Sequence, residues 1–206
     1  MNNVADKEQK STLTSMLRIR FKNILDPIGA FLNRLGIKPN TLTILGLVGN
    51  TFGAFFLAKG QIVLGGLMIL AMGPIDALDG TMARLRGEPS KFGAFVDSVT
   101  DRYSELVIYF GLLVYFIQLG NWMNISVVYL AAAGSVLVSY TRARAESLGY
   151  DVKIGLLTRL ERYFVLMPTL ILNIPMVGAW LIAIFANITA IQRILYIRKQ
   201  ARSKLD

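Results

Sequence analysis

Long apolar segments separated by short turns constrain this chain more than any other feature. An α-helix needs about 20 mainly apolar residues to cross the hydrocarbon core of a bilayer, which is about 30 Å thick. Because lipid offers no partner to backbone polar groups, a spanning segment must satisfy them internally, as a helix does. Six segments fit, at residues 42–58, 62–83, 92–119, 125–143, 156–173 and 176–196. The sequence therefore predicts an all-α integral membrane protein with six transmembrane helices.

The fifth predicted span differs from the others because charged residues occupy its first turns. Arg159, Glu161 and Arg162 lie there, and Pro168 interrupts the apolar run that follows. We count this segment as a span because the sixth span requires a return path across the membrane. Composition agrees with a membrane protein, since 54% of the residues are hydrophobic, whereas an average soluble domain has about 45–50% apolar residues.

The distribution of basic residues predicts the orientation in the membrane. Lys and Arg number 22 against 13 Asp and Glu. If the odd-numbered connections between spans lie on one side, Lys59 is the single basic residue near that side. Cytoplasmic loops carry the excess of Lys and Arg, so we expect a multi-pass protein of the cell membrane with both termini in the cytoplasm. Topology then accounts for the basic excess, and no nucleic-acid partner is expected.

Residues 1–38 are predicted to form a cytoplasmic tail and an amphipathic helix, ahead of a membrane domain at residues 39–206. The apolar residues Leu13, Met16, Leu17, Phe21, Ile24 and Leu25 recur at helical spacing, with Arg18, Arg20 and Lys22 between them. This pattern is typical of a helix that lies in the membrane interface. An amphipathic arm packed on the helix bundle explains the same pattern equally well.

The absence of two residue types limits the chemistry. The sequence contains no Cys and no His, which excludes disulfides, thiol nucleophiles and imidazole bases or ligands. Proton transfer near neutral pH is left to a carboxylate, a Lys, a Tyr or water. A metal ion would have to be held by oxygen ligands, which favours magnesium, manganese or calcium.

Four aspartates lie inside the predicted second and third spans. Asp76 and Asp79 are three residues apart near the end of one, and Asp97 and Asp101 are four residues apart near the start of the next. An Asp at the centre of a bilayer costs about 2.5–3.5 kcal/mol, so acids in spans are usually functional. Because the two spans are antiparallel neighbours and each pair shares a helix face, we expect the four carboxylates to converge in the cytoplasmic half of the membrane.

Four converging carboxylates require cations, because like charges and desolvation disfavour the ionised forms. Four are enough for two divalent ions about 3.5–4 Å apart, an arrangement that acts on phosphates. Gly80 and Ala83 on the second span, with Gly93 one turn before Asp97, leave room for a ligand beside them. The alternatives are that the acids pair with Arg84, Arg86 or Arg102 to hold the bundle together, or line a cation pathway.

These residues spell the pattern Asp76-x-x-Asp79-Gly80-x-x-Ala83-Arg84, then eight residues, then Gly93-x-x-x-Asp97-x-x-x-Asp101. The pattern resembles the signature of the CDP-alcohol phosphotransferase family. The resemblance implies transfer of a phosphatidyl group from CDP-diacylglycerol to a small alcohol, with release of CMP. It also implies that the four aspartates hold two magnesium ions per protomer, with manganese as a substitute, and that Asp101 is the general base. Members of the family usually work as homodimers, with the active site facing the cytoplasm.

The resemblance further implies a binding site for the CDP-lipid. The residues assigned to it are Asn40, Thr41, Leu42, Thr43, Asp79, Gly80, Ala83, Arg84, Ser90 and Gly93. Asn40 is also a favourable N-cap for the first span, because its side chain can accept from a free backbone amide. A helix N-terminus is in addition a ready anion site.

The acceptor is inferred from arginines at the cytoplasmic ends of the last three spans. Arg142, Arg159, Arg162 and Arg193 lie in segments that resemble those of prokaryotic phosphatidylinositol phosphate synthases. Arginine suits a planar, bidentate phosphate clamp, and the resemblance implies that these four hold the phosphate of myo-inositol phosphate. Glycerol 3-phosphate, which would give phosphatidylglycerol phosphate, needs much the same clamp and is the alternative within the family. Topology alone also predicts basic residues at these positions.

Two alternatives of another class place acids in transmembrane helices. One is a divalent-cation transporter with the aspartates as its ion site, and the other is a carboxylate-dependent prenyltransferase. Neither explains the Gly80-x-x-Ala83-Arg84 element between the two pairs of aspartates.

Overall fold

The computed structural model describes residues 13–87, 90–152 and 154–203, with the side chains from residue 21 onward. Within these ranges the chain forms seven α-helices and no β-strand. The helices are α1 Leu13–Arg34, α2 Pro39–Ala58, α3 Ile62–Leu85, α4 Lys91–Gln118, α5 Trp122–Ser147, α6 Arg159–Ile171 and α7 Pro175–Arg202. The predicted all-α class is confirmed.

Four of the described helices are long and apolar enough to cross a membrane, namely α2, α3, α5 and α7. This supports a multi-pass membrane protein and is fewer than the six predicted spans. The predicted third span corresponds to α4, which has the length but carries the acids Asp97, Asp101 and Glu105. The predicted fifth span corresponds to α6, which has 13 residues and is therefore about 20 Å long at 1.5 Å per residue.

The start of α6 explains why this helix is shorter than predicted. Residues 154–158 are not helical, and the helix begins after a capping box in which the Thr158 amide donates to the Glu161 carboxylate at 2.5 Å. Such a box satisfies amides that the first helical turn leaves free. Glu161 therefore caps the first turn of α6, and the helix begins at Arg159 instead of at the predicted residue 156.

The start of α2 corrects a second expectation. Asn40 is not the N-cap, because Pro39 is the first helical residue and Lys38 takes the cap position without a side-chain hydrogen bond. Proline suits the first helical position since its fixed φ is helical and its missing N–H group would be unpaired there in any case.

The turns after α2 and α4 pass through Gly60 and Gly120 at φ values of 78° and 64°, which glycine adopts without steric cost.

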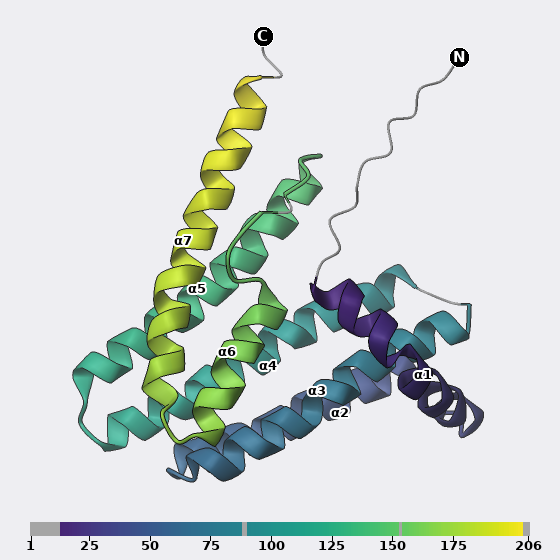
Figure 1. Cartoon of the computed structure of the whole chain (residues 1–206), viewed down its shortest axis with the longest axis horizontal. Coiled ribbons are helices and arrows are strands. Elements are labelled where there is room, and N and C mark those ends of the chain that lie inside the picture. Colours follow the sequence, from purple (N-terminus) through teal and green to yellow (C-terminus); the bar gives the residue numbers. More distant parts are fainter. Residues whose placement is uncertain (1–12, 88–89, 153, 204–206) are drawn as a thin grey trace.

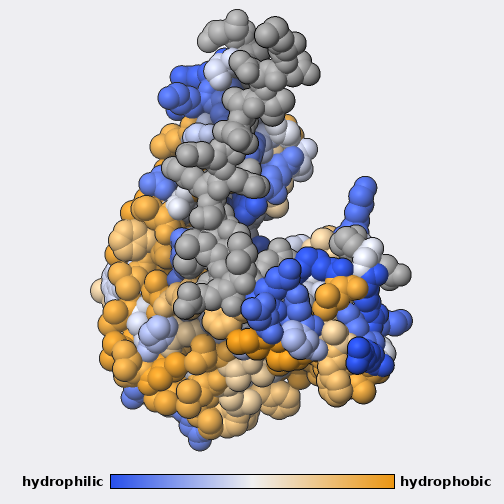
Figure 2. All heavy atoms as spheres, turned by 45° about the vertical axis from the view of Figure 1, so that its right-hand side comes forward, coloured by the Kyte–Doolittle hydropathy of each residue, from blue (hydrophilic) through white to orange (hydrophobic). Residues whose placement is uncertain are grey.

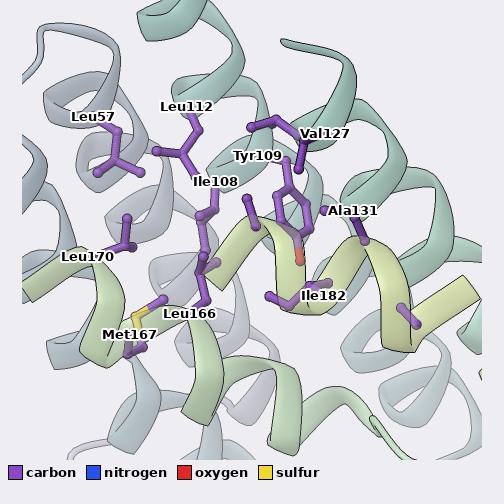
Figure 3. Close-up of a cluster of buried hydrophobic side chains, with 14 of the residues drawn as sticks. Leu57, Ile108, Tyr109, Leu112, Val127, Ala131, Leu166, Met167, Leu170 and Ile182 are labelled. Carbon is purple, nitrogen blue, oxygen red and sulfur yellow. The ribbon is translucent and has the colours of Figure 1, made fainter. Parts of the chain in front are cut away.

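Two groups of helices build the molecule. In Figure 1, α2, α3 and α4 run together toward α1, whereas α5 and α7 lie side by side and extend toward the C-terminus. Figure 3 shows the apolar core between the groups, where Leu57, Leu112 and Leu170 meet from α2, α4 and α6. The core continues through Val128 on α5 and Ile182 on α7, both fully buried. Burial against several helices fixes α6 despite its short length.

Helix α1 packs on the end of α3. Asn33 donates to the Met82 carbonyl at 3.1 Å, and the Arg86 guanidinium donates to the Asn33 side chain at 2.7 Å and to the Ile37 carbonyl at 2.6 Å. Another side of α1, continued by Leu35 just after the last helical residue, exposes a row of apolar side chains at helical spacing. They are Phe21, Ile24, Ile28, Phe31 and Leu35. The predicted amphipathic helix thus exists and runs through to Arg34, and it has both a packed side and an exposed apolar side.

Part of the predicted amphipathic pattern stays a prediction, because the structure does not describe the side chains of Leu13, Met16, Leu17, Arg18 and Arg20.

Figure 2 shows that apolar residues cover a broad zone of one face of the molecule, whereas hydrophilic residues gather in two separate regions with a hollow between them. This division is typical of a protein that contacts lipid along one zone and water beyond it.

Candidate metal and phosphate site

Three carboxylates from α3 and α4, two helices that both pack against α2, lie close together. Asp76 comes from α3, Asp97 and Asp101 come from α4, and one carboxylate oxygen of each lies within 4.8 Å of the others. Asp97 and Asp101 share a face of α4 because they are four residues apart. Asp101 is buried and the other two are half-buried. The structure therefore brings together three of the four predicted aspartates.

The fourth aspartate, Asp79, turns toward α2. Its carboxylate accepts from the Thr43 hydroxyl at 2.6 Å and from the Gly80 amide at 2.5 Å, and both Asp79 and Thr43 are buried. Residues three apart on a helix are rotated by about 60°, since 3.6 residues make a turn. Asp79 can therefore point at a neighbouring helix while Asp76 points at α4.

Arg159 supplies positive charge to the acidic cluster. This residue opens α6, and its guanidinium contacts Asp76 at 3.1 Å and also pairs with Asp101. The Arg102 guanidinium lies 3.6 Å from Asp101. The sequence offered Arg84, Arg86 and Arg102 as ion-pair partners of the aspartates, and of these Arg102 lies near them. Arg84 instead donates to the Thr81 hydroxyl at 2.9 Å, and Arg86 holds α1.

The donor set fits a divalent metal ion. Among the described residues, two buried side-chain atoms lack a hydrogen-bond partner, and both lie here: the Asp101 Oδ1 atom and one terminal nitrogen of Arg102. An unpartnered buried carboxylate oxygen is costly in a protein interior, and bound cations remove that cost. Because all three side chains offer oxygen, the cluster suits magnesium, manganese or calcium.

The residues assigned to the CDP-lipid lie near the cluster on three helices. Asn40 is the second residue of α2, and its side-chain oxygen lies 3.6 Å from the point where a Cβ on Gly93 would be. Ser90 caps α4 by accepting from the Gly93 amide at 2.9 Å. Thr41 and Arg84 are exposed, Leu42 is buried, and Gly80 and Ala83 are half-buried. The start of α2 therefore lies beside the start of α4, as a shared binding site for a nucleotide would require.

The four arginines assigned to the acceptor phosphate occupy different surroundings. Among them, Arg159 contacts two of the three acids, Asp76 and Asp101. The Arg162 guanidinium is fully buried and donates to both carboxylate oxygens of Glu105, at 2.7 and 2.9 Å, and to the Leu157 carbonyl at 3.2 Å. Arg193 is buried and donates to the carbonyls of Ile154, at 2.9 Å, and Val138.

Arg142, the fourth of these arginines, is exposed on the last turns of α5. It pairs at 2.8 Å with Glu146, one helical turn further along the same helix. An exposed pair of this kind contributes little to stability, so Arg142 can exchange Glu146 for a phosphate oxygen at low cost.

The sequence reasoning missed two residues that make contacts around the acidic cluster, Glu105 and Tyr163. Glu105 follows Asp101 by four residues and extends the acidic face of α4 by one turn, so the spacing of the three acids was a usable signal. Tyr163 follows Arg159 by four residues on α6, and its hydroxyl reaches the backbone of α3. Nothing in the local sequence marks that contact.

Comparison with known proteins agrees with the geometry of the site. The sequence signature described as CDP-alcohol phosphatidyltransferase matches residues 37–192. The archaetidylinositol phosphate synthase of Pyrococcus horikoshii is 40% identical over 191 residues, which cover 91% of this chain and 98% of that protein. The phosphatidylinositol phosphate synthase of Streptomyces avermitilis is 33% identical over 209 residues, which cover 93% of this chain and 85% of that protein.

Solved structures extend the similarity to the fold. The crystal structure of Mycobacterium tuberculosis phosphatidylinositol phosphate synthase with CDP-DAG bound has a TM-score of 0.81 at 30% identity, and the match covers 85% of this chain and 94% of that one. The same enzyme in complex with manganese and citrate has a TM-score of 0.79 at 30% identity, covering 84% of this chain and 88% of that one.

Proposed function

This chain belongs to the CDP-alcohol phosphatidyltransferase family, and on that premise we propose that it transfers a phosphatidyl group from CDP-diacylglycerol to a hydroxyl of myo-inositol phosphate. CMP leaves, and phosphatidylinositol phosphate forms. The observation that carries the proposal is the convergence of Asp76, Asp97 and Asp101 with Arg159 beside them. Membership in an enzyme family also favours a transferase over a cation transporter.

The four aspartates Asp76, Asp79, Asp97 and Asp101 would hold two magnesium ions, for which manganese can substitute. Bound there, the ions would neutralise the diphosphate of the CDP-lipid and the charge that develops on the departing CMP. Three of these carboxylates already lie within reach of one another. The fourth, Asp79, is held one turn along α3 by Thr43.

Asp101 is the proposed catalytic base. Its Oδ1 atom is buried and has no hydrogen-bond partner among the described residues, so it is free to accept a proton. The acceptor hydroxyl oxygen bonds to the phosphorus that carries the diacylglycerol, and the bond from that phosphorus to the bridging oxygen of CMP breaks. Asp101 takes the hydroxyl proton, as a positioned carboxylate can in a chain without histidine.

The proposed CDP-lipid site combines the start of α2 with the facing ends of α3 and α4. It consists of Asn40, Thr41, Leu42, Thr43, Asp79, Gly80, Ala83, Arg84, Ser90 and Gly93. The closeness of Asn40 to Gly93 supports this grouping, since the absence of a side chain at Gly93 lets Ser90 and Asn40 approach its backbone.

Inositol phosphate is the proposed acceptor for two reasons. The names of the two relatives differ in their lipid part, archaetidyl or phosphatidyl, and share inositol phosphate. Arg142, Arg159, Arg162 and Arg193 are the proposed phosphate ligands. A guanidinium has five N–H groups, so the three bonds that Arg162 makes to Glu105 and Leu157 orient it and leave capacity for a phosphate oxygen.

The proposed placement in the membrane completes the function. Six spans with both termini in the cytoplasm, an interfacial helix within residues 1–38 and a membrane domain at residues 39–206 would put the acids at the cytoplasmic side. The four long apolar helices and the exposed apolar row on α1 support this placement. We also propose a homodimer with one site per protomer.

The test is CMP release by the purified protein with magnesium and CDP-diacylglycerol. Four acceptors are compared: myo-inositol 3-phosphate, glycerol 3-phosphate, free inositol and serine. Release with inositol phosphate alone is expected. Release with glycerol 3-phosphate instead would keep the mechanism and make phosphatidylglycerol phosphate the product. A CDP-archaeol arm, run in parallel, tests the lipid part of the donor.

A further inference from the structure

A proline interrupts the hydrogen bonding of α3 just before the acidic cluster. In an α-helix the amide of each residue donates to the carbonyl four residues earlier. Pro74 lies inside α3 and has no N–H group, so the Leu70 carbonyl loses its helical donor. Within a membrane such a carbonyl must find another partner in the protein. Asp76 follows this interruption by two residues.

Tyr163 on α6 supplies the missing donor. Its hydroxyl oxygen lies 3.0 Å from the Ile69 carbonyl oxygen and 3.2 Å from the Leu70 carbonyl oxygen. The approach requires glycine at position 73, because a Cβ there would lie 2.9 Å from the Tyr163 hydroxyl oxygen. The tyrosine hydroxyl, the glycine and the proline therefore form one local arrangement.

The same face of α6 holds α3 on the other side of the proline. Arg159 precedes Tyr163 by one helical turn, and its guanidinium contacts Asp76 at 3.1 Å. Two successive turns of α6 thus attach to the stretch of α3 from Ile69 to Asp76. The other two acids of the cluster come from α4, which has no internal proline, so Asp76 is the member that follows an interruption in its own helix.

We propose that Tyr163 is a positioning residue, which holds the proline-interrupted stretch of α3 so that Asp76 meets Asp97 and Asp101. The inference rests on the proposed function, because it treats Asp76 as a ligand of the divalent metal. Tyr163 acts through its hydroxyl group and the Leu70 carbonyl, and touches neither the metal nor the substrates. Its loss should therefore weaken metal binding.

The test is Mn²⁺ binding to the purified full-length protein in detergent, followed by the electron paramagnetic resonance signal of free Mn²⁺. Tyr163→Phe removes the hydroxyl group alone, and about tenfold weaker binding is expected, in the range seen when a group supporting a metal ligand is lost. Tyr109→Phe is the matched control, since it also removes a buried tyrosine hydroxyl. That hydroxyl contacts the Ser135 hydroxyl at 3.1 Å and none of the three acids. Its Mn²⁺ affinity should stay at the wild-type value.

A second pair of variants tests the route through the carbonyl. Pro74→Ala restores an amide that can donate to Leu70, so the effect of Tyr163→Phe should disappear in the Pro74→Ala background. The same pair carries the test if Tyr163→Phe alone does not fold. An equal loss of affinity in both backgrounds would overturn the proposed route.

Two outcomes separate this inference from the proposed function. Wild-type affinity in Tyr163→Phe, with Asp76→Asn clearly weakened, overturns the role of Tyr163 and leaves the metal site intact. Equal Mn²⁺ binding by the wild type and Asp76→Asn shows that Asp76 is no ligand, which overturns both.

Discussion

Buried polar groups behave differently in the apolar core and in the acidic cluster. In the core, the Tyr109 and Ser135 hydroxyls bond to each other at 3.1 Å, and the Thr189 hydroxyl accepts from the Leu156 amide at 3.1 Å while donating to the Phe185 carbonyl at 2.7 Å. In the cluster, Asp101 Oδ1 has no such partner within the part of the chain that the structure describes. The core is complete as it stands, whereas the cluster keeps an unpartnered carboxylate oxygen that a cation would satisfy.

This difference separates residues that stabilise the protein from residues that are proposed to act on substrate. Paired groups between helices hold the fold, because removing one partner leaves the other unsatisfied. The unpartnered carboxylate is available for metal and proton transfer. Mutations in the two regions should therefore change different quantities, stability in one and turnover in the other.

The largest effect is expected from Asp101→Asn. An amide can neither bind the metal as a carboxylate does nor take the acceptor proton, and loss of a general base alone costs about 10²–10⁴ in rate. CMP release should fall by at least that factor while some CDP-lipid binding persists. Retained turnover would show that Asp101 is not the base, and the distinction between the apolar core and the acidic cluster would then fail.

The next largest effect is expected at the buried pair Arg162 and Glu105. Breaking a buried ion pair by removing one partner costs about 3–5 kcal/mol, so Arg162→Ala and Glu105→Ala should each lower the thermal unfolding midpoint. Because Arg162 is also a proposed phosphate ligand, Arg162→Ala should in addition weaken use of the acceptor far more than donor binding.

Kinetics at saturating CDP-diacylglycerol separate the two roles of Arg162. A raised KM for inositol phosphate in Arg162→Ala supports phosphate binding. Equal losses in donor and acceptor use would mean that the arginine contributes to folding alone. Arg142→Ala is the control for the unfolding measurement alone, since its exposed pair with Glu146 should have little effect on unfolding.

A smaller effect is expected from Thr43→Val. The substitution keeps the shape of the side chain and removes the hydroxyl that donates to Asp79 at 2.6 Å. Loss of a group that orients a metal ligand lowers metal affinity or activity by about 10–100-fold, so the magnesium concentration at half-maximal activity should rise. Thr43→Ser restores the hydroxyl and should recover most of the wild-type value. Failure of serine to do so would contradict this role.

The smallest effect is expected from Tyr109→Phe in the core. A typical buried hydrogen bond contributes about 0.5–1.5 kcal/mol net, so the unfolding free energy should fall by about 1 kcal/mol, with CMP release and its magnesium dependence unchanged. A large loss of activity in this variant would mean that the core and the cluster are coupled.

The sequence alone predicts the features that depend on local spacing. Apolar runs between glycine-rich turns predict α2, α3, α5 and α7, since length and hydropathy decide them. The spacing of four between Asp97 and Asp101 predicts that both face one way, and the structure confirms that they meet Asp76.

Features that depend on contacts between distant segments escape sequence reasoning. The pair formed by Arg162 and Glu105 joins residues 57 positions apart, and the direction of Asp79 depends on Thr43 across 36 positions. Local residues at the helix starts explain the differences between prediction and structure in α2 and α6. Pro39 takes the helix start where Asn40 was expected to be the cap, and the Thr158 capping box shortens α6.

Mass spectrometry of the lipid product is the most direct test of the central claim, that the acidic cluster transfers a phosphatidyl group to a phosphorylated polyol. Purified protein is incubated with magnesium, CDP-diacylglycerol and myo-inositol 3-phosphate, beside the Asp101→Asn variant. The account predicts a lipid that carries inositol and both phosphates, one joining it to diacylglycerol and one retained from the acceptor, made by the wild type alone. A product without the acceptor phosphate, or equal product from Asp101→Asn, would contradict it.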